Sequence, residues 1–159
     1  CVFHLRGKID LNKISLEKNA KFFISEISML ELYYGAEKSE NPVKNLKLKA
    51  LDKEFIFTCV SMGNPHAITV VKDTEKFDVE TYGRILEVDK AFPNKTNVEF
   101  VQIVDKEHIK MRVWERGAGE TLACGTGACA TAVACHLNGL TDRNVYIELL
   151  RRNIKNRME

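Results

Sequence analysis

The sequence has little of what marks several large classes of protein. Only 3 Pro and 9 Gly occur in 159 residues, which excludes collagen-like and low-complexity chains. No apolar run approaches the ~20 residues that a membrane helix needs, so we expect no membrane partner. The 24 Lys and Arg nearly balance 22 Asp and Glu, and a net charge of +2 gives no electrostatic case for a nucleic-acid partner.

Cysteine is present, but its number and spacing argue against a disulfide scaffold. The chain has five cysteines, an odd number, and we expect no secretory signal. The cysteines form no paired C-x2-C clusters, so we expect no metal site. These features favour a reduced, cytoplasmic setting. With 45% hydrophobic and 29% charged residues, the chain is long enough to bury a core.

Hydrophobic patterning predicts short strands and two helices. Helices are expected over 78–90 and from residue 128 to a C-cap at Gly139, and the second is apolar on nearly every side, which predicts a buried helix. The fold class that we predict is α+β, with mostly antiparallel strands wrapped around a buried central helix. Strands are expected over 22–27, 29–34, 55–60, 67–71, 98–104, 109–116 and 145–150.

The polar segment from Gly35 to Asn45 is the best candidate for a domain boundary, because Asn41-Pro42 marks a loop. We therefore expect residues 1–35 to be the remnant of an N-terminal domain. Residues 36–159 then form a C-terminal domain that is incomplete at its end.

Cys124 is the strongest candidate for a reactive group. It directly precedes Gly125-Thr126-Gly127 and the predicted buried helix, so its sulfur lies near a helix N-terminus. The free N–H groups and the positive dipole end there stabilise a thiolate and lower the pKa of the thiol. The glycines also let backbone N–H groups reach an anion such as a carboxylate. A structural cysteine in a tight strand-to-helix turn is the alternative, and the spacing does not separate the two. Cys59, Cys129 and Cys135 are expected to be core residues.

Two further places carry polar groups that a scaffold could present. His66 follows Asn64 in a turn between two apolar strands, although a loop histidine can also be merely solvated. Glu115 falls on the apolar face of its strand by alternation, where an acid needs a partner or a function. Glu115 and Arg116 could bind the ammonium and carboxylate of an amino acid, or form a local ion pair.

Three blocks of the sequence together resemble the diaminopimelate epimerase family. They are SMGNPH at 61–66, TNVEF at 96–100 and RVWERGAGETLACGTGACA at 112–130, and their order and separations also look like the family. The resemblance implies cofactor-independent epimerisation of LL-diaminopimelate to meso-diaminopimelate, a step of lysine and peptidoglycan precursor synthesis. It implies two cysteines that exchange protons on opposite faces of the α-carbon, with no cofactor and no metal.

The resemblance also implies roles for particular residues. Cys124 matches one of the two catalytic cysteines, and His66 and Glu115 match polar residues that tune the thiols. The partner implied is a small amino-acid substrate, and a homodimer remains open. The positions that match substrate-binding residues are Asn64, Asn97, Glu115, Arg116, Gly125 and Thr126.

The chain departs from the family pattern in two places. The CGNG-type motif of the first catalytic cysteine is absent, and so is the Pro-Gly-Gly hairpin that follows the last strand. We therefore expect the chain to be truncated at both ends and inactive alone. A non-catalytic remnant is one alternative, and another cofactor-independent racemase, acting on proline or hydroxyproline, is a second. The ERGAGET run argues against the racemase, and the short Gly125-Thr126-Gly127 turn is only a weak match to a nucleotide-binding loop.

Overall fold

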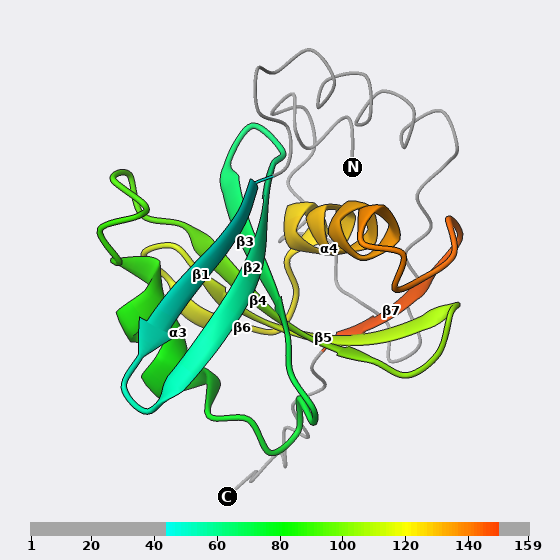
Figure 1. Cartoon of the computed structure of the whole chain (residues 1–159), viewed down its shortest axis with the longest axis horizontal. Coiled ribbons are helices and arrows are strands. Elements are labelled where there is room, and N and C mark those ends of the chain that lie inside the picture. The colour runs from blue at the N-terminus through cyan, green and yellow to red at the C-terminus, as the bar shows by residue number, and fades with distance from the viewer. Residues whose placement is uncertain (1–43, 150–159) are drawn as a thin grey trace, which may run out of the picture.

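The structure is a computed structural model that describes residues 44–149, which form one sheet and two helices (Figure 1). The α+β class is therefore confirmed for the described part of the chain. In chain order the elements are β1 (Lys44–Ala50), β2 (Lys53–Ser61), β3 (Pro65–Val70), α3 (Val79–Glu87), β4 (Asn97–Ile103), β5 (His108–Glu115), β6 (Gly119–Thr121), α4 (Gly125–Leu137) and β7 (Tyr146–Leu149).

The seven-stranded sheet is mixed. Its order is β1-β2-β3-β4-β5-β6, and β7 pairs with the first half of β5, beyond the stretch that β6 covers. The pairs β1–β2, β2–β3, β4–β5 and β5–β6 are antiparallel, whereas β3–β4 and β5–β7 are parallel. A parallel neighbour needs a crossover, and α3 supplies it between β3 and β4.

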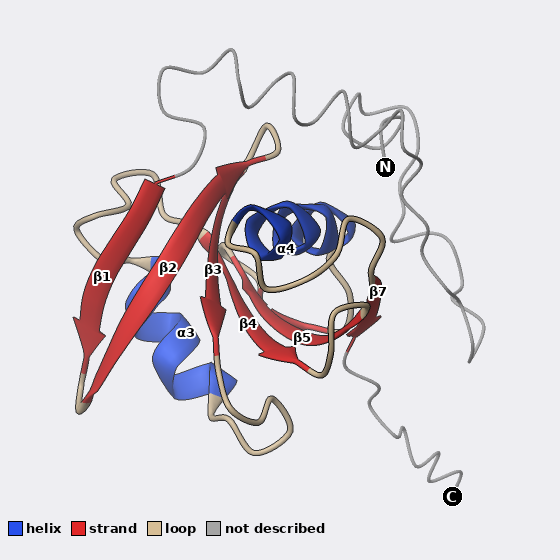
Figure 2. Ribbon diagram, turned by 45° about the vertical axis from the view of Figure 1, so that its right-hand side comes forward, coloured by secondary structure: helices blue, strands red, loops and turns tan. Residues whose placement is uncertain are grey.

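The two helices pack on opposite faces of the sheet (Figure 2). Alternation along each strand sends one set of side chains to each helix. On β5, Ile109, Met111 and Val113 face α4, and Trp114 faces α3. The α3 side is rich in aromatic residues, with Phe77 and Phe100 ring centroids 4.6 Å apart.

Helix α4 begins three residues earlier than the sequence pattern predicts. It starts at Gly125, with Cys124 as its N-cap, because the Cys124 sulfur accepts a hydrogen bond from the Gly127 N–H. Residues 126–135 are all buried, in keeping with the apolar pattern. Its end confirms the predicted cap, since Gly139 has φ +67° and the Leu140 N–H donates to the Cys135 carbonyl at 2.9 Å.

Two strands were missed by sequence patterning. β1 has exposed lysines at alternate positions and half-buried leucines between them, a pattern typical of an edge strand, but it follows a segment that we assigned as a loop. β6 lies in the glycine-rich stretch between β5 and α4, where no strand was predicted, and only its pairing with β5 defines it. Among the described residues, no helix is long and apolar enough to cross a membrane.

Several predictions fall outside the described residues. These are the strands over 22–27 and 29–34, Cys1, the domain boundary after residue 35 and the end of the chain beyond Leu149.

Candidate active site

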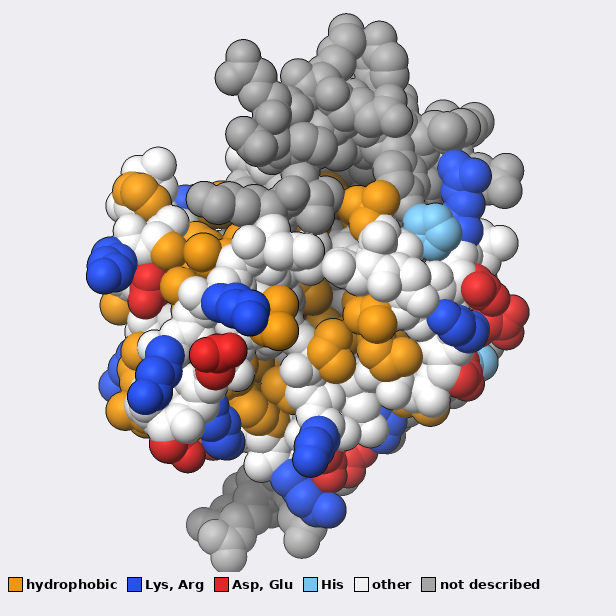
Figure 3. Space-filling model, in the orientation of Figure 1, with side chains coloured by type: hydrophobic (Ala, Val, Ile, Leu, Met, Phe, Trp, Pro, Cys, Tyr) orange, Lys and Arg blue, Asp and Glu red, His pale blue; other side chains and the backbone are white. Residues whose placement is uncertain are grey.

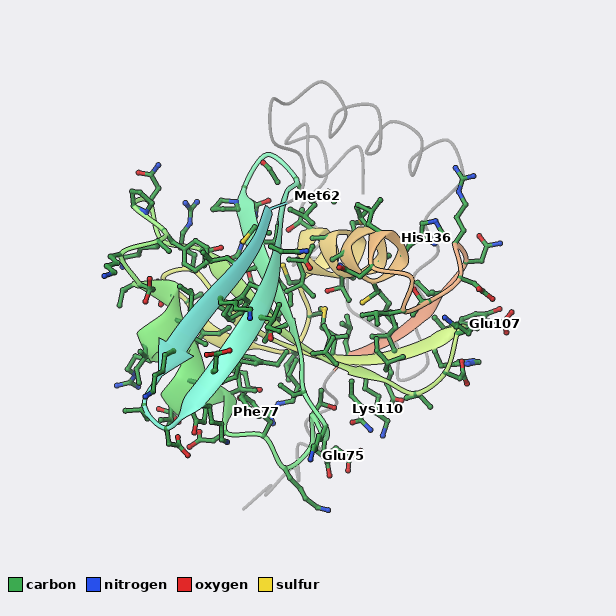
Figure 4. The ribbon with its side chains drawn as sticks, in the orientation of Figure 1. Met62, Glu75, Phe77, Glu107, Lys110 and His136 are labelled. Carbon is green, nitrogen blue, oxygen red and sulfur yellow. The ribbon has the colours of Figure 1, made fainter. Side chains whose placement is uncertain are left out.

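The candidate site lies at the N-terminal end of α4, where β3 and β4 run side by side. Register pairs His66 of β3 with Asn97 of β4. Figure 4 shows Met62, in the β2–β3 turn, close to this end of α4, while His136 marks the opposite end. Sequence segments near residues 64, 97, 115 and 124 converge here.

Cys124 is held against the first turn of α4. Its sulfur accepts the Gly127 N–H at 3.3 Å and lies 3.5 Å from the Thr126 hydroxyl oxygen. The whole residue is 7% exposed. A Cβ atom added at Gly127 would lie 3.2 Å from this sulfur and 2.7 Å from Glu99 Oε1, so only glycine fits beneath the thiol.

The expectation of a lowered thiol pKa is wrong. Burial raises the pKa of Cys124 to about 11, since the thiolate loses hydration, and the charge of Glu115 adds to the rise. The Thr126 hydroxyl and the Gly127 N–H oppose the rise without cancelling it. The group is therefore a protonated thiol at neutral pH.

His66 is a buried strand residue and not the loop histidine that the sequence suggested. It is 1% exposed, because it is the second residue of β3 and lies beneath the start of α4. Its Nδ1 lies 2.6 Å from Glu99 Oε1, and its Nε2 lies 3.1 Å from Asn64 Oδ1. Asn64 Nδ2 in turn donates to Thr126 Oγ1 at 3.5 Å.

Glu99 is a residue of this cluster that our sequence reasoning did not single out. It is fully buried on β4, on the face that packs against α4. The signal was present, since an acid at the centre of the apolar run NVEFV requires a partner.

Asn97 and Arg116 meet through the backbone. The Asn97 amide donates to the Pro65 carbonyl at 3.1 Å and accepts the Arg116 N–H at 2.8 Å. The Arg116 guanidinium donates to the Asn94 carbonyl at 3.1 Å from an exposed position. Asn97 thus fixes the loop after β5, and Arg116 projects from that loop.

Glu115 lies at the end of β5, on the side of the candidate site. Its carboxylate accepts a hydrogen bond from the Thr121 hydroxyl of β6, and its charge acts on both Cys124 and Glu99. Gly125 and Thr126 form the first turn of α4.

The loop that carries Arg116 is braced from α3. The Glu87 carboxylate accepts the Trp114 indole N–H at 2.8 Å and the Gly117 N–H at 2.9 Å. Burial alone would raise the pKa of Glu87, but these two donors and Lys95 lower it on balance. Glu87 is thus an ionised anchor for both sides of the loop.

The described residues contain no group of three or more His, Cys, Asp or Glu side chains placed to hold a metal ion. A groove of about 940 Å³ lies away from the site, lined by Ile56, Ile68 and Val70 of the sheet and Leu140 after α4. Apolar side chains are exposed in the middle of the face in Figure 3, between charged groups at its margins. No residue of the polar cluster around Cys124 lines this groove.

The raised pKa of Cys124 predicts a loss of stability at alkaline pH. The folded state keeps the thiol proton up to about 11, whereas the unfolded chain releases it near the ordinary value of 9.0. The stability that the protonated Cys124 thiol contributes is therefore complete below pH 9 and falls as the pH rises toward 11. Between pH 7 and about pH 10.5, the free energy of unfolding should fall by about 2 kcal/mol less in Cys124→Ala than in the unsubstituted chain. Urea unfolding at the two pH values measures the difference, and equal falls would contradict the buried thiol.

Comparison with known proteins places the same region in one family. The diaminopimelate epimerase family profile matches residues 58–158. A protein named diaminopimelate epimerase from Methanococcus maripaludis (strain S2) is 47% identical over 138 residues, covering 84% of this chain and 50% of the relative. Proteins of the same name from Acetivibrio thermocellus and Pelotomaculum thermopropionicum are 56% identical over 98 residues and 41% identical over 161 residues. These two alignments cover 62% and 91% of this chain, and 35% and 58% of the relatives. The chain spans about half the length of the curated relatives it matches.

Proposed function

Because this chain belongs to the diaminopimelate epimerase family, we propose that it forms one face of a site that converts LL-diaminopimelate to meso-diaminopimelate. Cys124 is the proton carrier of that face. The observation that carries the proposal is the placement of this thiol: it caps a buried helix beside a polar cluster, within a core that is otherwise apolar.

Inversion at the α-carbon needs an acid on one face and a base on the other. A base removes the α-proton and leaves its electron pair on the carbon. The Cys124 S–H then breaks, and its proton passes to the opposite face of the carbon while the sulfur keeps the bonding electrons. A thiol whose pKa is raised to about 11 carries the proton needed for this direction at neutral pH. In the reverse direction the thiolate is the base, and the Gly127 N–H and Thr126 hydroxyl stabilise it.

The second proton carrier belongs to the opposite face of the substrate. Among the described cysteines, Cys129 and Cys135 are each 1% exposed within the apolar cluster around α4, so neither sulfur can reach a substrate. Cys59 packs against the cluster on the α3 side of the sheet, away from Cys124. We therefore propose a two-cysteine mechanism in which a thiol from outside the described residues completes the site. We expect little turnover from the 159 residues alone.

Substrate binding is proposed for the polar groups around Cys124. The first turn of α4, with Gly125 and Thr126, offers N–H groups to the carboxylate of the reacting centre. The same place is surrounded by Arg116 and Asn64, which lie on two loops, and by Asn97 of β4. The Glu115 carboxylate suits the ammonium group of the substrate. A small amino acid is the substrate class that this set of groups fits.

We also propose that α4 is the central helix of a domain whose strands continue around it. The support is its burial over residues 126–135. We propose the boundary of this domain after residue 35 on the basis of the sequence pattern alone.

A chimera tests the function. Residues 44–149 of this chain replace the matching segment of the Methanococcus maripaludis relative, and solvent deuterium uptake at the α-carbon of both diaminopimelate isomers is followed by proton NMR. We expect the chimera to exchange the α-proton and interconvert the isomers, and the isolated chain to show little exchange. The relative itself is the positive control.

Two results would count against the proposal. A folded chimera without exchange would favour the non-catalytic remnant, because every group of the opposite face is then present. Exchange with proline but not with diaminopimelate would favour a different racemase.

A further inference from the structure

Glu99 and His66 form a pair that is closed off from solvent. Both side chains are 0% exposed, and the Nδ1 to Oε1 distance is 2.6 Å. His66 reaches Glu99 from β3, Glu115 lies on the neighbouring strand β5, and Cys124 lies at the start of α4. Among the described residues, His66 is the basic side chain that pairs with the Glu99 carboxyl group.

The hydrogen bonds of the His66 ring fix how many protons the pair holds. Asn64 Oδ1 is an acceptor only, so the Nε2 that lies 3.1 Å from it must carry a hydrogen. The contact between Nδ1 and Oε1 needs a second hydrogen, on either atom. A neutral histidine beside an ionised glutamate has one hydrogen for these two contacts. The pair therefore holds one proton more than that state and is neutral overall.

The second carboxylate oxygen of Glu99 leads to the same conclusion. Glu99 Oε2 is buried and accepts no hydrogen bond from the described residues. An ionised carboxylate with one unpaired buried oxygen is costly, whereas the carbonyl oxygen of a neutral carboxyl is much less so. Burial raises the pKa of Glu99 although His66 opposes this, and the charge of Glu115 adds to the rise.

We propose that Glu99 is a positioning residue that shares a proton with His66 and thereby directs a chain of hydrogen bonds toward the Cys124 sulfur. His66 Nε2 donates to Asn64 Oδ1, and Asn64 Nδ2 donates to Thr126 Oγ1 at 3.5 Å. The Thr126 hydroxyl hydrogen is then free to point at the sulfur, 3.5 Å away. The number of protons that the Glu99–His66 pair holds does not depend on the proposed function. Only the role of the hydrogen-bond chain in turnover rests on that function.

Nitrogen-15 NMR of the histidine rings tests the proton count in the full 159-residue chain. We expect the His66 ring to carry a hydrogen on Nε2, and Nδ1 to share the hydrogen of its contact with Glu99. His108, which is exposed beside Asp105, is the solvent-accessible reference. A His66 ring with hydrogen on Nδ1 and a bare Nε2 would overturn the proposal, because Glu99 would then be ionised and the Asn64 amide turned over.

A matched pair of variants tests the positioning role through the alkylation rate of Cys124, followed by peptide mass spectrometry. In Glu99→Gln the amide N–H still donates to Nδ1, so the rate at about pH 8 should change less than about twofold. If Glu99 were ionised, removing its charge would raise the rate by about tenfold, the effect of one pKa unit, and that result would overturn the proposal.

Glu99→Met fills the same space but cannot donate a hydrogen bond to His66 Nδ1. The Thr126 hydroxyl then loses its orientation toward the Cys124 sulfur, and the thiolate loses a hydrogen bond that stabilises it. We expect alkylation to slow by about threefold or more. A rate equal to that of Glu99→Gln, or a faster rate from a loosened site, would show that Glu99 has only a packing role. Should neither variant fold, the ring NMR of the unsubstituted chain decides the question alone.

Discussion

Replacing Cys124 by alanine is expected to lower turnover of the active chimera by about 10³-fold or more, since general acid–base groups contribute about 10² to 10⁴. The alanine side chain leaves Gly127 and Thr126 in place but removes the proposed proton carrier of this face. Substrate binding should survive, because the groups proposed to hold the carboxylate and ammonium are untouched. The measurement is the rate of LL-to-meso conversion at saturating substrate.

Cys135→Ala is the control, because it changes the same residue type in the same helix. Cys135 is buried in the apolar cluster and far along α4 from the site. We expect this variant to lose some stability, on the order of 1 kcal/mol for a small cavity, and to keep turnover within a few fold. Equal losses in the two variants would mean that the helix, and not the thiol, is what turnover requires.

The second large effect is expected at Gly83, in the middle of α3. Alanine is a better helix former than glycine by about 1 kcal/mol, so the sequence alone predicts a more stable helix for Gly83→Ala. In the structure, an added Cβ would lie 2.6 Å from Cβ and Cγ of Trp114 and 2.8 Å from its Cδ2. These atoms are at the base of a buried indole whose N–H is held by Glu87, so they cannot move aside freely.

We therefore expect Gly83→Ala to lower the free energy of unfolding by about 2–3 kcal/mol, the usual range for overpacking. Urea unfolding of the full chain measures it. Glu80→Ala in the same helix is the control, because it removes only an exposed ion pair with Arg84, worth about 0.5 kcal/mol or less. A stabilised Gly83→Ala variant would refute the close contact between α3 and β5.

The sequence by itself determined the elements whose signals are local. Alternation on β5 and the apolar pattern of α4 depend only on residues within each segment, and both were predicted correctly within a few residues. The glycine cap at Gly139 was equally predictable, because a left-handed residue after a helix is a property of the backbone there. The family was also carried by sequence, since its blocks are long enough to identify it.

The tertiary structure alone decided what depends on neighbours from distant segments. β6 exists because β5 offers it hydrogen bonds, and it has no strong pattern of its own. The pKa of Cys124 rises because the sheet and α4 remove water from a sulfur that a helix N-terminus would otherwise favour as a thiolate. Glu99 and His66 are 33 residues apart, and only the parallel pairing of β3 with β4 brings them within 2.6 Å. Burial and pairing between strands are long-range properties, so these parts of the site followed from the fold and not from the local sequence.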